Sequence, residues 1–183
     1  MNQVLAIPKK LPKKKSPQFA CAVGILTYGN TVLLQKRPPK AIWGGLWSLP
    51  EGEWQALPEG ERSNTAPREP LASKQLLELI LPNRFSKKPS VLFGQSVTMG
   101  TRVKHIFSHR ILQIQAYEMV LNGKAKKELD TSMQSDETQF IWADLGALDQ
   151  YGLAQPIRLL LESWSLARGA AELDQCANAS PIV

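Results

Sequence analysis

The sequence predicts an α+β fold in which a mixed β-sheet is packed between helices. Three features of the 183-residue chain support this prediction. Two aliphatic segments near the N-terminus flank a short run of turn residues, a later segment alternates apolar with polar residues, and one amphipathic helix lies near the C-terminus. The expected order is two strands, a loop, a helix, four strands and a final helix.

The first two strands are expected at residues 19–26 and 31–34. The first is an almost continuous apolar run, and the second is β-branched and aliphatic. Tyr28, Gly29 and Asn30 between them are residue types that favour a hairpin turn. Further along, residues 52–70 contain three prolines and two glycines with few aliphatic residues, which predicts a long irregular loop.

The middle of the chain contains the remaining strands and one short helix. Residues 71–81 are expected to form that helix, capped by Ser73. Strands are expected at 91–97, 102–109 and 139–142. Another is expected to be buried on one face only, because Leu112, Ile114 and Ala116 alternate with two glutamines.

The final helix has the clearest pattern. Ile157, Leu160, Leu161 and Trp164 follow helical spacing, and Pro156 suits the first turn, while Gly169 is expected to end the helix. We therefore divide the chain into a basic arm or interdomain linker (1–17), one domain (18–168) and a disordered C-terminal tail (169–183).

Charge is distributed unevenly along the chain. Residues 1–50 contain eight Lys and Arg and no Asp or Glu, whereas the remainder contains 14 basic and 16 acidic side chains. Residues 7–17 combine three prolines with five lysines, which predicts an extended arm. A polyanionic partner would explain this asymmetry, with nucleic acid as the first candidate and an anionic membrane surface as the second. A solvated linker would explain it equally well. The arm lysines are Lys9, Lys10, Lys13, Lys14 and Lys15.

Composition also excludes several classes of protein. No apolar run approaches the roughly 20 residues of a membrane-spanning helix, and the N-terminus has no secretory apolar region. Two cysteines cannot form a disulfide framework or a four-cysteine metal site. We expect a cytoplasmic, nucleoid-associated protein with no membrane partner.

Two segments contain the residues best suited to chemistry. In the first, Trp43 and Trp47 flank Gly44 and Gly45, so the indoles can clamp a flat ring or close a corner of the core. The second, residues 102–110, contains both histidines of the chain. No Asp, Glu or Cys accompanies them, so a zinc site is not favoured. An aromatic residue, a serine and a histidine among basic residues suit contacts to phosphates or base edges. A strand that turns into a hairpin would explain the same residues at least as well.

Together these segments resemble a known family. Residues 32–39 followed by 42–50 look like the start of the C-terminal domain of the adenine DNA glycosylase MutY family. Residues 105–109 resemble the Phe-Ser-His loop of that domain, 151–157 resemble the start of its closing helix, and the lysine–proline arm resembles the preceding linker. The resemblance implies a Nudix fold, related to MutT, and recognition of 8-oxoguanine paired with adenine in double-stranded DNA during base excision repair.

The resemblance does not include the N-terminal catalytic domain of these glycosylases. That domain has a helix-hairpin-helix, a catalytic Asp and Glu, and a 4Fe–4S cluster, so no cofactor is expected in this chain. The chain is either a separate reader domain, working with a glycosylase domain in trans, or part of a longer glycosylase. The residues expected to bind DNA or the lesion are Phe107, Ser108, His109, Arg37 and Lys104, with the arm lysines on the DNA backbone.

The alternative function is that of a diverged Nudix hydrolase acting on oxidised or other nucleoside diphosphate derivatives. Such enzymes use a Glu-rich helix with the pattern G-x5-E-x7-R-E-U-x-E-E-x-G-U, in which U is a bulky aliphatic residue, to hold divalent cations. Gly45 and Glu51 match its beginning, but Glu59 stands where arginine is required. The expected helix at 71–81 has a single carboxylate, Glu78. Metal-dependent hydrolysis is therefore the less favoured function.

Overall fold

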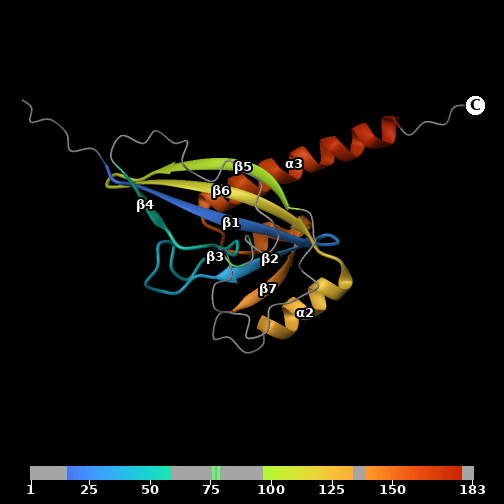
Figure 1. The fold of residues 1–183 in the computed structure, drawn as a ribbon, viewed down its shortest axis with the longest axis horizontal. Helices are drawn as coiled ribbons and strands as arrows, with labels where there is room; N and C mark the ends of the chain where they lie inside the picture. Colours follow the sequence, from blue (N-terminus) through green and yellow to red (C-terminus); the bar gives the residue numbers. More distant parts are fainter. Residues whose placement is uncertain (1–15, 59–75, 77, 79–96, 134–138, 179–183) are drawn as a thin grey trace, which may run out of the picture.

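Strand β1 lies at the centre of a mixed sheet (Figure 1). The computed structural model describes residues 16–58, 76, 78, 97–133 and 139–178. Within these, seven strands form one sheet in which β3, β2, β1, β6 and β5 are successive neighbours, while β4 pairs with β1 and β7 with β2. The strands are β1 (Gln18–Tyr28), β2 (Thr31–Lys36), β3 (Trp47–Ser48), β4 (Gln55–Leu57), β5 (Val97–Ile106), β6 (Ile111–Val120) and β7 (Phe140–Asp144).

The sheet is mixed because β1 and β6 run parallel, whereas the other pairs are antiparallel. The predicted hairpin is confirmed: β1 and β2 pair around a turn in which Gly29 has φ 57°. A left-handed backbone of this kind suits glycine, which has no Cβ to clash.

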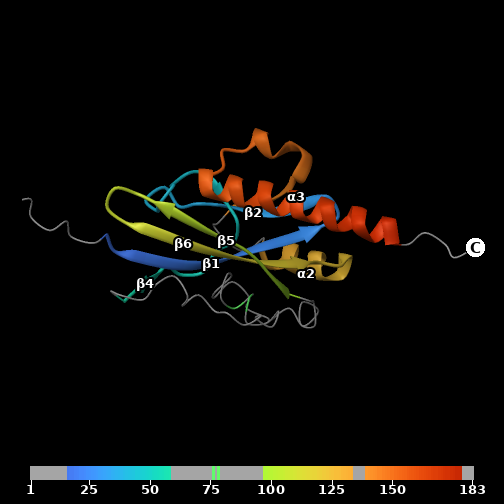
Figure 2. The same cartoon turned by 90° about the horizontal axis from the view of Figure 1, so that it is seen from above.

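Helices cover both faces of the sheet (Figure 2). Helix α3 (Gln155–Asn178) lies over one face, and α2 (Gly123–Met133) lies on the other. A short 3₁₀ helix, η2 (Leu145–Gln150), connects β7 towards α3, and its first turn is capped by Asp144, which accepts from the backbone N–H of Gly146 at 2.7 Å. The predicted α+β arrangement with a mixed sheet between helices is confirmed.

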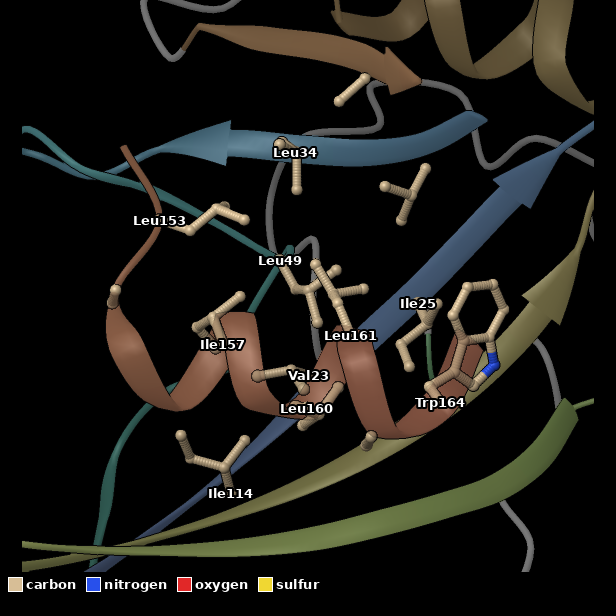
Figure 3. Packing of buried hydrophobic residues seen from close by; sticks show 14 of the residues in the cluster. Val23, Ile25, Leu34, Leu49, Ile114, Leu153, Ile157, Leu160, Leu161 and Trp164 are labelled. Carbon is tan, nitrogen blue, oxygen red and sulfur yellow. The ribbon is translucent and has the colours of Figure 1, made fainter. Parts of the chain in front are cut away.

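The core has two parts, one on each face of the sheet. The helical spacing identified in the sequence places Ile157, Leu160, Leu161 and Trp164 on the side of α3 that packs on the sheet, and all four are buried (Figure 3). On the opposite face, Leu26, Leu33, Tyr117 and Met119 pack with Ala125 and Leu129 of α2. Strands β1 and β6 are therefore buried on both faces at the centre of the domain.

Several boundaries differ from the prediction. Helix α3 continues through Gly169 to Asn178, because an isolated glycine lowers helix stability without ending the helix, so the predicted disordered tail begins as helix. Helix α2 was not predicted. Strand β4 lies inside the predicted loop at 52–70. The expected strand at 102–109 ends at Ile106, as part of a longer strand with an irregularity between Met99 and Arg102.

The glutamines of β6 also correct the prediction. Gln113 and Gln115 are buried rather than exposed, because the second face of β6 is covered as well. Their amides have partners: Gln113 Nε2 donates to Gln18 Oε1 at 3.0 Å, and Gln115 Nε2 donates to the carbonyl of Gly100 at 2.9 Å.

Parts of the prediction fall outside the described residues. These are the arm 1–15, residues 59–70 of the predicted loop, most of the helix at 71–81, the strand at 91–97 except its last residue, and residues 179–183 of the tail. Leu76 and Glu78 of that helix are described and helical, and Leu76 is fully buried. No helix in the described part of the chain is long and apolar enough to cross a bilayer.

Candidate functional site

Two loops that are distant in the sequence meet at one end of the sheet. One connects β2 to β3 (residues 37–46), and the other is the turn between β5 and β6 (residues 107–110). The ring of Trp43 in the first loop lies 5.8 Å from the ring of Phe107, centroid to centroid, and 5.7 Å from that of His105. The structure therefore joins the two segments that the sequence analysis had singled out separately.

The turn carries the predicted Phe-Ser-His residues. It is closed by a hydrogen bond from the Phe107 N–H to the carbonyl of Arg110 at 2.8 Å. Ser108 and His109 are exposed, and Ser108 Oγ lies 3.3 Å from His109 Nδ1. Phe107 is half-buried among rings, with centroids 4.6 Å from His105 and 6.0 Å from His109. Ser108 is thus at the tip of the turn, and Phe107 anchors it.

The β2–β3 loop has a backbone that only certain residues permit. The N–H of Arg37 donates to the carbonyl of Leu46 at 3.0 Å, and the N–H of Gly45 donates back to the carbonyl of Arg37 at 3.1 Å. Gly45 has φ 78°, and a Cβ on Gly44 would lie 2.0 Å from the carbonyl oxygen of Pro39. The two glycines are therefore required for the loop to close this tightly.

Arg37 occupies a different place from the one predicted for it. Its residue surface is 4% exposed, its Nε donates to the carbonyl of Ile42 at 2.5 Å, and its Nη1 forms an ion pair with the carboxylate of Glu51. Burial raises the pKa of Glu51, and the Arg37 guanidinium opposes that rise. A guanidinium enclosed in this way offers no surface to DNA, so the assignment of Arg37 as a DNA contact is corrected to a structural role.

Lys104 lies apart from the ring cluster, which consists of Trp43, His105, Phe107 and His109. It is exposed on β5 and pairs with Gln113 of β6. Alternation along the strand places it on the face opposite Val103 and His105. Of the predicted set, the structure brings Phe107, Ser108 and His109 together. The arm lysines lie outside the described residues.

The described residues do not fit a magnesium site of the Nudix hydrolase type. Among them, no three His, Cys, Asp or Glu side chains gather closely enough to hold a metal ion. Glu51, the one carboxylate of that pattern in the described part, faces Arg37 instead. The positions after it, including Glu59, fall within residues 59–75 and lie outside the described residues.

Comparison with known proteins identifies the family. The family model described as "NUDIX domain" matches residues 21–163. This chain belongs to the NUDIX domain family. The match extends from within β1 into α3, so it includes both loops of the site.

Solved structures show the same fold at low sequence identity. A mutT/nudix family protein from Listeria innocua is 17% identical, with a TM-score of 0.54 over 87% of this chain and 99% of that chain. The C-terminal domain of mouse MUTYH, in complex with human PCNA, is 18% identical, with a TM-score of 0.52 over 82% and 90%. The MutT protein from Methanosarcina mazei Go1 is 12% identical, with a TM-score of 0.51 over 85% and 99%.

The sequence analysis missed two contacts of this site. Trp43 is half-buried and packs against the core, as one of its two interpretations expects, but its contact with the Phe107 turn was not predicted. Glu51 had been considered only as part of a metal-binding pattern, and it is the partner of Arg37. The signal available in the sequence was the placement of Arg37 and Glu51 on either side of the Gly-Gly segment. Lys40 is the only other charged residue between them.

Proposed function

We propose that this NUDIX domain is the lesion-reading part of an adenine DNA glycosylase of the MutY family. It binds 8-oxoguanine opposite adenine in duplex DNA and does not itself break a glycosidic bond. The observation that carries the proposal is the turn at 107–110, which presents Ser108 and His109 to solvent from a ring cluster. A glycosylase catalytic domain, in the same protein or in trans, supplies the chemistry, and the compartment is the cytoplasm, at the nucleoid.

The chemistry of Ser108 suits the lesion. In 8-oxoguanine, N7 carries a hydrogen and C8 carries an oxygen, so the Hoogsteen edge offers a donor next to an acceptor. A hydroxyl group can both accept and donate, whereas lysine and arginine only donate. Ser108 Oγ is exposed and lies 3.3 Å from His109 Nδ1, which can orient it. The hydroxyl therefore matches an edge that plain guanine does not present.

Phe107 takes a more limited role than free intercalation would require. Its ring packs against Trp43, His105 and His109 and is half-buried. In this conformation it supports the turn, and only the part of the ring that remains exposed can contact the DNA. Phosphate contacts position the duplex without distinguishing the bases, so the preference for the lesion comes from the turn.

Competition binding tests this proposal directly. The parent should prefer an 8-oxoguanine:adenine duplex over a guanine:adenine duplex, and Phe107→Ala with Ser108→Ala should lose about 1–3 kcal/mol of that preference while binding plain duplex almost as well. Ile106→Ala is the matched control, because Ile106 immediately precedes Phe107, is 67% exposed and lies on the face of β5 opposite His105. Equal preference in the parent and the double variant would overturn the role of the turn.

The hydrolase alternative is decided by a second measurement on the same protein. A MutT protein is among the structures with a similar fold. The alternative function predicts a nucleoside diphosphate derivative as the ligand. The proposal expects no magnesium-dependent hydrolysis of 8-oxo-dGTP or other nucleotides. Turnover that is abolished by chelating the metal would favour the alternative function.

The basic arm makes a separate prediction about affinity. If its five lysines neutralise about five phosphates, the log–log salt slope of DNA binding should be near −4 to −5. Deleting residues 1–17 should flatten that slope and leave the preference for the lesion unchanged, because the turn is retained. A truncated protein with the parental slope would identify the arm as a solvated linker.

A further inference from the structure

We infer that Trp43 is a positioning residue for the Phe107 turn, held in place by the buried Arg37–Glu51 pair. This inference rests on the proposed function, because it assigns Trp43 a part in lesion preference. The proposed path runs from strand β1 through Glu51 and Arg37 to Trp43, and from Trp43 to Phe107. The first step consists of backbone hydrogen bonds on both sides of Glu51, and the second is the ion pair between Glu51 and Arg37. The third is the contact of the guanidinium with the Trp43 ring, and the last is the contact of that ring with Phe107.

The contact of Trp43 with the turn is the last step. Its ring is tilted by 38° against that of Phe107 and meets the ring of His105 edge to face at 66°. His105 lies near the end of β5, and Phe107 is the first residue of the turn. Aromatic contacts of this kind favour particular ring orientations, so Trp43 restricts the angle at which the turn leaves the strand.

The backbone of Trp43 shows that its placement is imposed by its surroundings. Trp43 has φ 56° and is the single non-glycine residue with a positive φ among the described residues. A bulky residue in this region is strained and persists only where its neighbours over-determine it, often at functional sites. Here the carbonyl of Ile42 accepts from Arg37 Nε at 2.5 Å, and the guanidinium carbon lies 5.6 Å from the centroid of the Trp43 ring.

The first two steps connect Arg37 to β1, the central strand of the sheet. Glu51, its ion-pair partner, forms an antiparallel bridge with Val23 of β1. The flanking backbone bonds are Gly24 N–H to the Pro50 carbonyl at 2.9 Å and Gly52 N–H to the Ala22 carbonyl at 3.0 Å. These bonds hold Glu51 in a fixed position beside β1. The ion pair with Glu51 therefore fixes where the Arg37 guanidinium lies in the loop.

Trp47 provides an internal control for this inference. It belongs to the same Trp-Gly-Gly segment and is also half-buried. Its ring, however, packs edge to face with Tyr151 at 6.5 Å and under the ammonium of Lys36 at 4.7 Å. Neither of these contacts involves the Phe107 turn, so removing the Trp47 ring should disturb a different part of the domain.

The experiment compares three variants with the parent: Trp43→Gly, Trp43→Phe and Trp47→Ala. Glycine adopts a positive φ without strain, so Trp43→Gly removes the ring while keeping the backbone of the loop. Two readouts are used. The ¹H–¹⁵N residual dipolar couplings of residues 105–109 depend on bond orientation and not on ring currents, so they report the conformation of the turn without DNA. The ratio of dissociation constants for guanine:adenine and 8-oxoguanine:adenine duplexes reports lesion preference.

Trp43→Gly should change the dipolar couplings of the turn and reduce the preference ratio by about 3- to 10-fold, the range expected from one or two aromatic contacts. Trp43→Phe should restore part of both, and Trp47→Ala should leave both close to the parent. Parental dipolar couplings and ratio in Trp43→Gly would overturn the inference. If the parent itself shows no preference, the proposed function fails, and the dipolar couplings alone then decide whether Trp43 positions the turn.

Discussion

The same three kinds of side chain, a cation, a carboxylate and a tryptophan, meet at two places in this domain. At one, Arg37 pairs with Glu51 and its guanidinium lies beside the Trp43 ring. At the other, Lys126 Nζ lies 2.5 Å from a carboxylate oxygen of Asp130 and 5.1 Å from the centroid of the Trp142 ring. We refer to these as the loop cluster and the α2 cluster.

The two clusters differ in burial and in what they join. Side-chain exposure is 3% and 16% for the ion pair of the loop cluster, against 25% and 33% for that of the α2 cluster. The loop cluster connects β1 to an irregular loop, whereas the α2 cluster joins two residues one turn apart and fastens their helix to Trp142 of β7. Similar residue types thus hold the irregular β2–β3 loop in one place and secure a helix in the other.

Arg37→Met should have the largest effect on stability. It leaves the Glu51 carboxylate buried without its cation, and breaking a buried pair in this way typically costs about 3–5 kcal/mol. Urea unfolding at neutral pH measures the loss. Replacing both partners, as Arg37→Met with Glu51→Leu, should recover most of it, because no charge is then left unpaired.

The effect of Arg37→Met should depend on pH in a defined direction. Burial raises the pKa of Glu51, and Arg37 opposes the rise, so the folded-state pKa should be higher still in the variant. The folded variant then binds a proton that the unfolded chain has released. Its stability should therefore increase as pH falls through this raised pKa and decrease as pH rises through it. A loss of stability independent of pH would show that Glu51 remains solvated in the variant.

The sequence was sufficient to predict the parts of the domain that depend on local pattern. The hairpin turn at Gly29 and the buried face of α3 follow from residue type and spacing. Helix α2 was missed because only Ala125 and Leu129 of its residues are buried, so the apolar periodicity is weak. The predicted end of α3 at Gly169 is wrong, because one glycine lowers the stability of a helix without ending it.

The site could be predicted only in pieces. The Phe-Ser-His turn was identified by resemblance, but the contact of Trp43 with Phe107 depends on how β3, β5 and their loops are placed in the sheet. Arg37 looked like a DNA contact because basic residues are usually solvated. Its burial depends on Glu51, whose position is set by the bridge to Val23 rather than by any pattern along the chain.

Lys126→Met should have the smallest effect, with a loss below about 1 kcal/mol, because a partly exposed ion pair gains little over solvated charges. The order of the pair reduces its value further, since the lysine stands nearer the helix N-terminus and the aspartate nearer the C-terminus, against the helix dipole. Asp130 also accepts from Trp142 Nε1 at 2.7 Å, so Asp130→Ala should cost more than Lys126→Met. Asp130→Asn, which can keep an oxygen for the indole, should fall between them. If Lys126→Met were as costly as Arg37→Met under the same urea conditions, burial would not be what distinguishes the two clusters.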